Sequence, residues 1–241
     1  MKIAKISRPP SSPLQWCALR WGPQFQTVIS DEIQPWLSKL YGSHFIKIGP
    51  LSHSIDTSRC AISHQVRIGH DADQVDLVGD IEKLPIMSKS IDACLITHAL
   101  AWSKDPHQVL REVDRVLVDD GWIVLSEFNP YSLLGLARWW PGIAQKARFY
   151  PRSRLTDWLS LLNYEIVSCC ATQILPWRTQ SGMLTRHFPS LGCNNIILAR
   201  KRTYPLTLAK RRSSTQGARL RPAVNVSRQI CSLDDHHEAD K

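Results

Sequence analysis

Apolar residues along the first third of the chain follow a helical spacing and then a short continuous run. They recur at intervals of three and four between Phe25 and Leu40, which predicts an amphipathic helix that Pro35 is expected to bend. The apolar run 45–48 leads into Gly49 and is typical of a buried strand that enters a turn.

The middle of the chain alternates between strand and helix patterns. Segments 75–80 and 91–97 are predicted strands. Asp105 is placed to cap a helix that starts at Pro106, and segment 119–121 is expected to end this helix before a further strand. Strands that alternate with helices predict a parallel sheet with right-handed crossovers.

The alternation of helix and strand patterns continues to about residue 200 and then ends. Segment 155–162 has a helical apolar face, and segments 164–172 and 195–200 are predicted strands. We expect an irregular arm over residues 1–21, one domain over 22–202, and a disordered tail over 203–241, where large apolar residues are few.

Composition supports a single globular body. With 241 residues, of which 43% are hydrophobic, the chain can bury one sizeable core. No run reaches the roughly 18 apolar residues needed to span a bilayer, and the start lacks the apolar stretch of a signal peptide. The seven cysteines form no C-x-x-C pair. We therefore expect a soluble cytoplasmic protein with reduced thiols.

The positive charge is concentrated in one segment. The chain carries a formal charge of +9, but nine basic residues and no acidic one lie between Arg200 and Arg228. The remaining chain balances 21 basic against 21 acidic residues. The basic tail could contact RNA or acidic lipid headgroups, although a solvated terminus is the default interpretation. The cluster 234–238 has metal-ligand chemistry, but adjacent ligands rarely converge on one ion, so no metal site is predicted.

A block of ordered motifs lies between Gly79 and Pro130. Its parts are an acidic loop before Leu84-Pro85, Ser90-Ile91-Asp92 before a strand, Asp105-Pro106 at a helix start, Arg115-Val116-Leu117, and Gly121 before the next strand. In order and spacing this block resembles the type 11 methyltransferases of the class I S-adenosylmethionine-dependent superfamily. The whole chain also resembles a small group of uncharacterised bacterial methyltransferase-like proteins.

The resemblance implies a Rossmann-like, doubly wound α/β fold. Its sheet is expected to have seven mostly parallel strands, with the last two forming an antiparallel hairpin. Only 30 residues separate Gly49 from Gly79, which leaves little room for the usual helix, strand and helix. We therefore predict an abbreviated cofactor lobe at the N-terminal side of the sheet.

The resemblance also implies residues that bind S-adenosylmethionine. Gly49 corresponds to the glycine-rich loop after the first strand, where a missing side chain lets the backbone approach the cofactor. Asp80 matches the carboxylate that accepts a hydrogen bond from the adenine amino group, and its neighbour Ile81 is included in the site. Asp80 could instead simply cap a turn. Asp71 and Asp73 are loose candidates for the ribose hydroxyls.

His98 follows the fourth strand and would face the cofactor. A neutral imidazole there could act as a general base or orient the substrate, or it could be a structural histidine. Trp102 could line the pocket or cover the edge of the core. Further candidates for the substrate side are the residues after the fifth strand and four tryptophans: Glu127, Asn129, Pro130, Trp139, Trp140, Trp158 and Trp177.

Two functions remain open on these residues. The first is an S-adenosylmethionine-dependent methyltransferase that acts on a small or carrier-linked substrate. The second is a methyltransferase-like scaffold without cofactor, which binds a protein or nucleic-acid partner. The segment KIGPLS, which has a single glycine, motivates the second. A nicotinamide dehydrogenase and a P-loop hydrolase are poorly supported, because neither G-x-G-x-x-G nor G-x-x-x-x-G-K-[ST] occurs.

Overall fold

The computed structural model describes residues 13–70, 75–136, 147–177 and 189–203. By its internal contacts the chain divides into two units, Met1–Tyr204 and Pro205–Lys241. The second unit lies outside the described residues, so the predicted disorder of the tail and the rejected metal cluster at 234–238 stay predictions.

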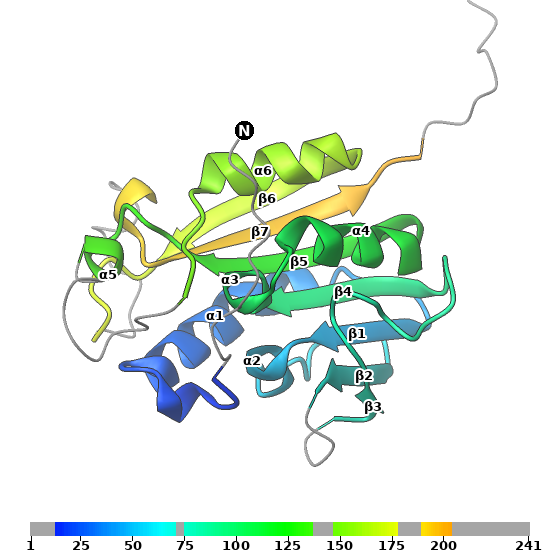
Figure 1. Ribbon diagram of the computed structural model, residues 1–241, viewed down its shortest axis with the longest axis horizontal. Coiled ribbons are helices and arrows are strands. Elements are labelled where there is room, and N and C mark those ends of the chain that lie inside the picture. Colours follow the sequence, from blue (N-terminus) through cyan, green and yellow to red (C-terminus); the bar gives the residue numbers. More distant parts are fainter. Residues whose placement is uncertain (1–12, 71–74, 137–146, 178–188, 204–241) are drawn as a thin grey trace, which may run out of the picture. The chain divides into compact units, whose positions relative to one another are not determined.

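Within the described residues, seven strands form one sheet in the order β3-β2-β1-β4-β5-β7-β6 (Figure 1). All neighbouring strands are parallel except β7, which is antiparallel to both β5 and β6. The predicted doubly wound α/β sheet with a C-terminal antiparallel hairpin is confirmed. The strands are β1 (His44–Ile48), β2 (His64–Gly69), β3 (Leu77–Val78), β4 (Ile91–Thr97), β5 (Leu117–Phe128), β6 (Tyr164–Thr172) and β7 (Asn194–Lys201).

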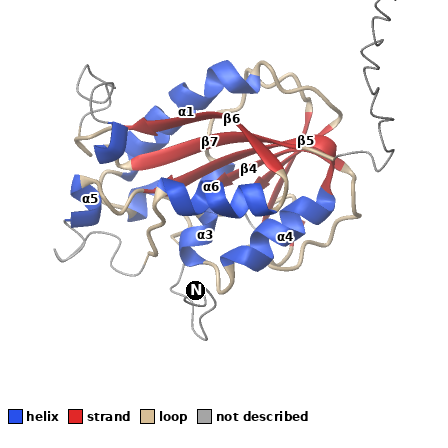
Figure 2. Cartoon of the chain, turned by 90° about the horizontal axis from the view of Figure 1, so that it is seen from above, coloured by secondary structure: helices blue, strands red, loops and turns tan. Residues whose placement is uncertain are grey.

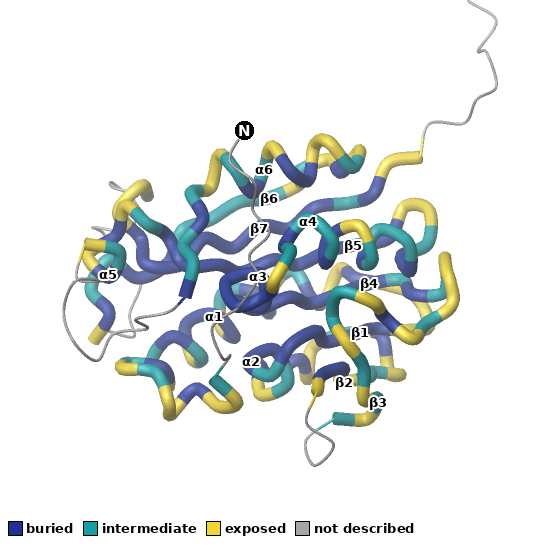
Figure 3. Tube along the Cα trace, viewed as in Figure 1, coloured by how far each residue is buried: buried dark blue, intermediate teal, exposed yellow. Residues whose placement is uncertain are grey.

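Helices cover both faces of the sheet, as the view from above shows (Figure 2). The helices are η1 (Trp16–Ala18), α1 (Gly22–Leu37), α2 (Pro50–His53), α3 (Ala99–Trp102), α4 (Pro106–Val116), α5 (Leu133–Leu136), α6 (Arg152–Leu161) and η4 (Pro189–Leu191). The helices α4 and α6 pack with one apolar cluster on one face, and α1, α2 and η1 with another. Buried positions concentrate in the central strands between these layers (Figure 3).

Alternating side chains of the central strands build these two clusters, as the twofold repeat of a strand requires. Ile46 and Ile96 point to the α4 side, whereas Phe45 and Leu95 point to the α1 side. All four are fully buried, which explains why apolar residues occupy consecutive positions in these strands.

The helix α4 begins where the sequence predicts. The Asp105 carboxylate accepts hydrogen bonds from the backbone N–H groups of His107 and Gln108, at 3.0 and 3.2 Å. Its end differs from the prediction, because β5 already starts at Leu117 and includes segment 119–121. Leu117 pairs with Ile91, and an irregularity in the register accommodates Asp120, whose φ is 65°. The acidic residues thus belong to a distorted strand and do not end the helix.

The cofactor lobe is abbreviated, as predicted. The helix α2 has four residues, and β3 has two, so that the predicted strand 75–80 is much shorter than expected. Asp71 and Asp73 lie outside the described residues. The α1 side of β2 therefore lacks a long covering helix in the described part of the chain.

The N-terminal arm is more ordered than the sequence suggests. Residues 13–21 include η1, and the Trp16 side chain is only 3% exposed within the α1-side cluster. Its indole N–H donates to the Leu51 carbonyl at 3.0 Å. The proline-rich composition of residues 1–21 gave no indication that Trp16 would be buried.

Six of the seven cysteines lie in the described residues and are free thiols. No described helix has the length and apolarity to cross a bilayer. No group of three or more metal-binding side chains is found in the same residues.

Candidate functional site

A cavity of about 200 Å³ opens at the carboxyl ends of β1, β2 and β4. The sheet reverses its strand order between β1 and β4, which is where open α/β sheets bind ligands. The cavity is lined by residues that follow four strands: Pro50, Gly69, His70, Asp80, Ile81, Glu82, Ala99, Trp102, Ser103 and Lys104. The predicted residues Asp80 and Ile81 are thus brought together with Trp102 in the lining of one cavity.

Gly49 lies directly beside this cavity and its backbone requires a glycine. Its φ of 86° is a conformation that residues with a side chain rarely adopt. A Cβ atom added to Gly49 would lie 2.9 Å from the Cβ of Ala99. The close approach of these two strand ends therefore depends on the missing side chain, and Pro50 begins α2 immediately afterwards.

Asp80 both shapes a turn and borders the cavity. Its Oδ1 atom accepts a hydrogen bond from the backbone N–H of Glu82 at 2.9 Å, and its carbonyl accepts one from Lys83 N–H at 3.0 Å. The carboxyl group is exposed at the cavity rim. Turn capping and ligand binding are therefore compatible, since a carboxylate has two oxygens and several acceptor sites.

His98 is placed at the end of β4 but is covered. It is fully buried with a φ of 54°, and neither ring nitrogen has a hydrogen-bond partner. Its ring stacks on Phe128 and meets the edge of Trp16 at a centroid distance of 5.5 Å. Burial lowers the pKa of His98 to about 3, so the imidazole is neutral at ordinary pH.

The burial of His98 restricts what its ring can contact. His98 does not line the cavity, although its neighbour Ala99 does. An imidazole that is neutral and covered by Trp16 can contribute lone pairs or an N–H only if the cover moves. Its assignment to base catalysis and to cofactor binding stays a prediction.

Glu127 holds the turn that forms one wall of the cavity. Its side chain at the end of β5 is fully buried, and Oε1 accepts a hydrogen bond from Leu100 N–H in α3 at 2.9 Å. Burial raises the pKa of Glu127 well above its usual range, against the opposing effect of the backbone donors and Arg148. Arg148 donates to the Ser103 carbonyl, which ties the other end of α3 to the segment 147–150.

Asn129 performs a similar joining role at the next position. Its side-chain amide donates to the carbonyls of Ser190 and Gly192, both at 2.8 Å, and its Oδ1 accepts from Tyr131 N–H at 3.2 Å. It therefore fixes η4 to the end of β5. Of the four tryptophans predicted near the substrate, Trp158 is buried in the core, Trp177 is exposed, and the other two lie outside the described residues.

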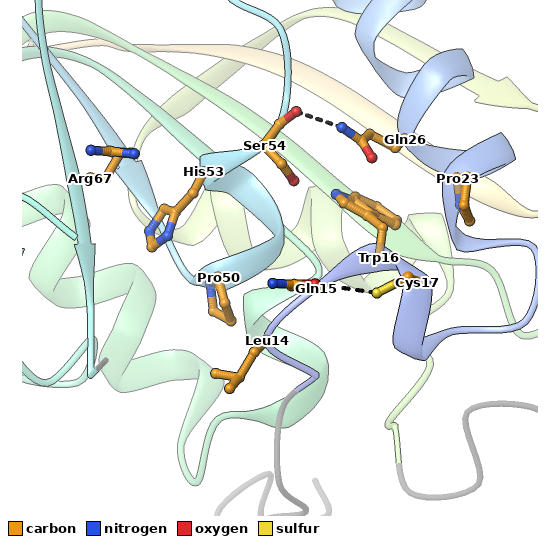
Figure 4. A pocket seen from close by; sticks show the side chains of 10 residues that line it. All are labelled: Leu14, Gln15, Trp16, Cys17, Pro23, Gln26, Pro50, His53, Ser54 and Arg67. Carbon is orange, nitrogen blue, oxygen red and sulfur yellow. Dashed lines mark hydrogen bonds between the residues drawn. The ribbon is translucent and has the colours of Figure 1, made fainter. Parts of the chain in front are cut away.

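A second cavity, of about 490 Å³, lies between the N-terminal segment, α2 and β2 (Figure 4). Gln26 donates to the Ser54 carbonyl at 2.7 Å on its wall. His53 donates through Nε2 to the Ile68 carbonyl at 3.1 Å, and burial lowers the pKa of this histidine. Sequence reasoning missed this cavity, because nothing in the motifs reveals that residues 14–17 fold back over α2.

The sequence also missed the residues that close the rim of the first cavity. Glu82 accepts hydrogen bonds through Oε1 from the backbone N–H groups of Lys104 and Asp105, at 2.6 and 2.9 Å. It thereby joins the loop after β3 to the start of α4. The acidic loop before Leu84-Pro85 contained this residue, but its partner 22 positions away could not be read from spacing.

The fold and the position of the cavity define the architecture of class I methyltransferases. Solved structures with this fold include a methyltransferase of Thermotoga maritima described as a possible histamine N-methyltransferase, with TM-score 0.54, 18% identity and coverage of 76% of this chain and 94% of that one. They also include the [4+2]-cyclase SpnF, with TM-score 0.52, 14% identity and coverage of 83% and 100%. At such identities these similarities show the fold alone.

Sequence comparisons assign the family. A methyltransferase domain is recognised over residues 36–125. The uncharacterized protein YafS of Escherichia coli is 42% identical over 234 residues, which cover 95% of this chain and 98% of YafS. The chain belongs to one family with YafS, and it has the fold of S-adenosylmethionine-dependent methyltransferases.

More distant relatives have named activities. The malonyl-[acyl-carrier protein] O-methyltransferase of Hamiltonella defensa is 37% identical over 75 residues, which cover 31% of this chain and 29% of that protein. The biotin biosynthesis bifunctional protein BioHC of Teredinibacter turnerae is 29% identical over 111 residues, which cover 46% of this chain and 18% of that protein. In both cases the match spans less than a third of the relative.

Proposed function

We propose that this protein is an S-adenosylmethionine-dependent methyltransferase that acts on a small or carrier-linked substrate. The observation that carries the proposal is the cavity at the strand-order switch, which Asp80, Ile81, Ala99 and Trp102 all line. The recognised methyltransferase domain supports the reaction class. The malonyl-[acyl-carrier protein] O-methyltransferase among the relatives supports a carrier-linked acceptor.

The residues present suit the nucleoside half of the cofactor. Asp80 offers a carboxylate to an amino donor, Gly69 permits close approach at the end of β2, and Ile81 and Trp102 offer apolar contact to a base. When bound, S-adenosylmethionine supplies an electrophilic methyl group on a sulfonium. The chain's own contribution is then to align the acceptor and exclude water, which methyl transfer principally requires.

Gly49 and His98 complete the proposed cofactor site. Gly49 would contribute the backbone at the end of β1, whose φ of 86° and close approach to Ala99 both depend on the missing side chain. His98 would contact the ligand or the acceptor after displacement of Trp16, and its two unpartnered ring nitrogens would then gain hydrogen bonds.

Cofactor affinity of Asp80→Ala tests the nucleoside site. We expect roughly tenfold weaker binding of S-adenosylhomocysteine, because a hydrogen bond to a charged acceptor is lost. Asp157→Ala, which removes an exposed carboxylate on α6, is the matched control and should bind as the wild type does. Equal affinity of both variants would remove Asp80 from the site.

A second candidate is a scaffold that does not bind the cofactor. The observation in its favour is the abbreviated lobe, in which Pro50 begins α2 directly after Gly49. The cavity of about 200 Å³ is also smaller than the lower end of typical ligand pockets, about 300 Å³. This candidate predicts no cofactor binding by ligand-free protein, together with a protein or nucleic-acid partner that co-purifies with the full chain.

The basic tail is proposed to contact RNA or an anionic surface, independently of either candidate. Six basic residues and no acidic one between Thr203 and Arg228 support this proposal. Truncation after Thr203 should reduce RNA binding at low salt. Equal binding by the full and the truncated chain would contradict it.

A further inference from the structure

Two histidines lie side by side on the first two strands of the sheet. His44 begins β1 and His64 begins β2, and the parallel register pairs these two positions directly. Figure 1 shows β1 and β2 next to each other and running in the same direction. Side chains at directly paired positions project from the same face of a sheet, so the two imidazole rings are neighbours.

One nitrogen of each ring makes the contact between them. The Nδ1 atoms of His44 and His64 lie 3.0 Å apart, and the ring planes cross at 85°. In a neutral imidazole one nitrogen carries the proton and the other has a free lone pair. One ring can therefore donate an N–H to the other, or both rings can carry their proton on Nε2. In the second arrangement two lone pairs are available to a cation.

The separation of the two Nδ1 atoms matches metal coordination. Zinc binds imidazole nitrogen at about 2.0–2.1 Å. Two such nitrogens on one ion lie about 2.8–3.4 Å apart, for angles between the square-planar value of about 90° and the tetrahedral value of about 109°. The observed 3.0 Å lies within this interval. Both rings can therefore bind one ion after small rotations of their side chains.

The backbone around the pair is fixed, and both rings are accessible. The Asp92 carboxylate on β4 accepts hydrogen bonds from the backbone N–H groups of Ser43 and His44, at 2.7 and 2.9 Å. His64 is held by the pairing of β2 with β1. Both histidines are exposed, so an ion and its water molecules can reach them from solvent. Ligands on strands are positioned more precisely than ligands on loops, which favours binding.

The two nitrogens also select the kind of ion. Imidazole suits zinc, copper and nickel, whereas magnesium prefers oxygen ligands and retains its waters. Within the described part of the chain no third metal-binding side chain joins the pair, so water would fill the remaining coordination positions. We propose that His44 and His64 together bind a divalent transition-metal ion such as zinc, which joins β1 to β2.

The proposed ion would strengthen the abbreviated lobe. On its outer side β2 pairs only with the two-residue strand β3, so a link to β1 adds to a small set of strand contacts. An ion that binds the folded chain alone stabilises it by mass action. The histidines lie at the amino ends of the strands, whereas the cavity opens at the carboxyl ends. The inference thus goes beyond the proposed function and requires neither the cofactor nor a methyl acceptor.

Calorimetric titration of the full chain, without an affinity tag, tests the proposal. Zinc sulfate is the ligand, and magnesium sulfate is the comparison. His44→Gln and His64→Gln each remove one imidazole and keep a polar, uncharged side chain. The tail contains another pair of adjacent histidines, His236 and His237. The double variant His236→Gln, His237→Gln is therefore the matched control.

The wild type and the tail variant should share a zinc site that each single variant binds roughly tenfold or more weakly, because only one imidazole remains there. Zinc should also raise the unfolding temperature of the wild type and of the tail variant, but not that of the single variants. Without metal, all four proteins should unfold at similar temperatures, since the substituted positions on the strands are exposed.

Any of four results would overturn the proposal. These are the absence of zinc-induced stabilisation in the wild type, an unchanged zinc affinity in either single variant, the loss of zinc binding in the tail variant, and magnesium binding as tight as that of zinc. Retained cofactor binding together with one of these results would remove the metal site and leave the proposed function intact.

Discussion

The imidazole of His98 stacks on the ring of Phe128, with 3.8 Å between the ring centroids and 14° between the ring planes. Trp16 closes the same space edge-on, so that the histidine is fully buried. Since neither ring nitrogen has a partner, the burial has an energetic cost that protonation would increase.

This cost predicts the pH dependence of stability. The pKa of His98 is lowered from 6.5 to about 3 by burial, so the unfolded chain binds the proton more readily than the folded chain in this interval. Stability is therefore complete above pH 6.5 and is lost as the pH falls toward 3. By pH 5 the free energy of unfolding should have fallen by about 2 kcal/mol through this group.

Urea unfolding of the wild type and His98→Phe, at several pH values, measures this contribution. The variant should show a smaller loss of stability below pH 6.5, whatever its stability at neutral pH. Parallel curves for the two proteins would show that His98 is not a buried neutral imidazole.

Gly49→Ala should destabilise the fold by about 1–3 kcal/mol, because it places a side chain at a φ that glycine tolerates best. Contact adds to this cost, since the new Cβ would lie 2.9 Å from that of Ala99. In an Ala99→Gly background the contact part should disappear while the backbone part remains. Thermal unfolding of the four proteins of this cycle measures both parts, and purely additive effects would mean that the two strand ends do not touch.

Glu127→Ala should cost about 1–3 kcal/mol more than Glu127→Gln, because only the alanine variant leaves the Leu100 N–H without its acceptor. The comparison is made by urea unfolding at neutral pH. Hydrogen exchange of α3 should accelerate in the alanine variant alone. If both variants exchange alike, the carboxyl group does not hold α3.

The raised pKa of Glu127 predicts how the stability of the wild type and of Glu127→Gln should differ with pH. Because its folded-state pKa lies above the unfolded one, the stability from this group is present at low pH and is lost as the pH rises. Glu127→Gln, which is neutral throughout, should therefore gain stability relative to the wild type as the pH increases. A constant difference between the two unfolding curves would contradict the raised pKa.

Trp16→Ala should destabilise the protein by about 3–5 kcal/mol, as expected for truncation of a buried tryptophan. Trp16→Phe retains a ring over His98 but loses the hydrogen bond to the Leu51 carbonyl, and so should cost less. Thermal unfolding monitors both, with Trp177→Ala as an exposed control that leaves the midpoint nearly unchanged.

Much of the sheet could be predicted from local patterns. Strand β4 and the start of α4 follow directly from the apolar run 91–97 and from the Asp105 cap. The end of α4 was predicted wrongly. Asp119 and Asp120 are residue types common at helix ends, but Leu117 pairs with Ile91, so the chain already forms a strand there. Pairing between distant segments outweighs local preference in such strands.

The candidate site was predictable only in part. Asp80 and Ile81 reach the cavity because they follow a strand, which is a local property. The cover over His98 depends on Trp16, which lies 82 positions earlier in a segment whose composition suggests no structure. Contacts of this kind carry no periodic signal, so the second cavity and the burial of His98 required the folded chain.

The central claim is that the chain binds S-adenosylmethionine at the cavity beside Asp80. Its most direct test is calorimetric titration of ligand-free full chain with S-adenosylmethionine and S-adenosylhomocysteine, after unfolding and refolding to remove any co-purified ligand. The account predicts binding at one site with a dissociation constant on the order of micromolar. The absence of heat and of thermal stabilisation at ligand concentrations on the order of millimolar would contradict it and would favour the scaffold.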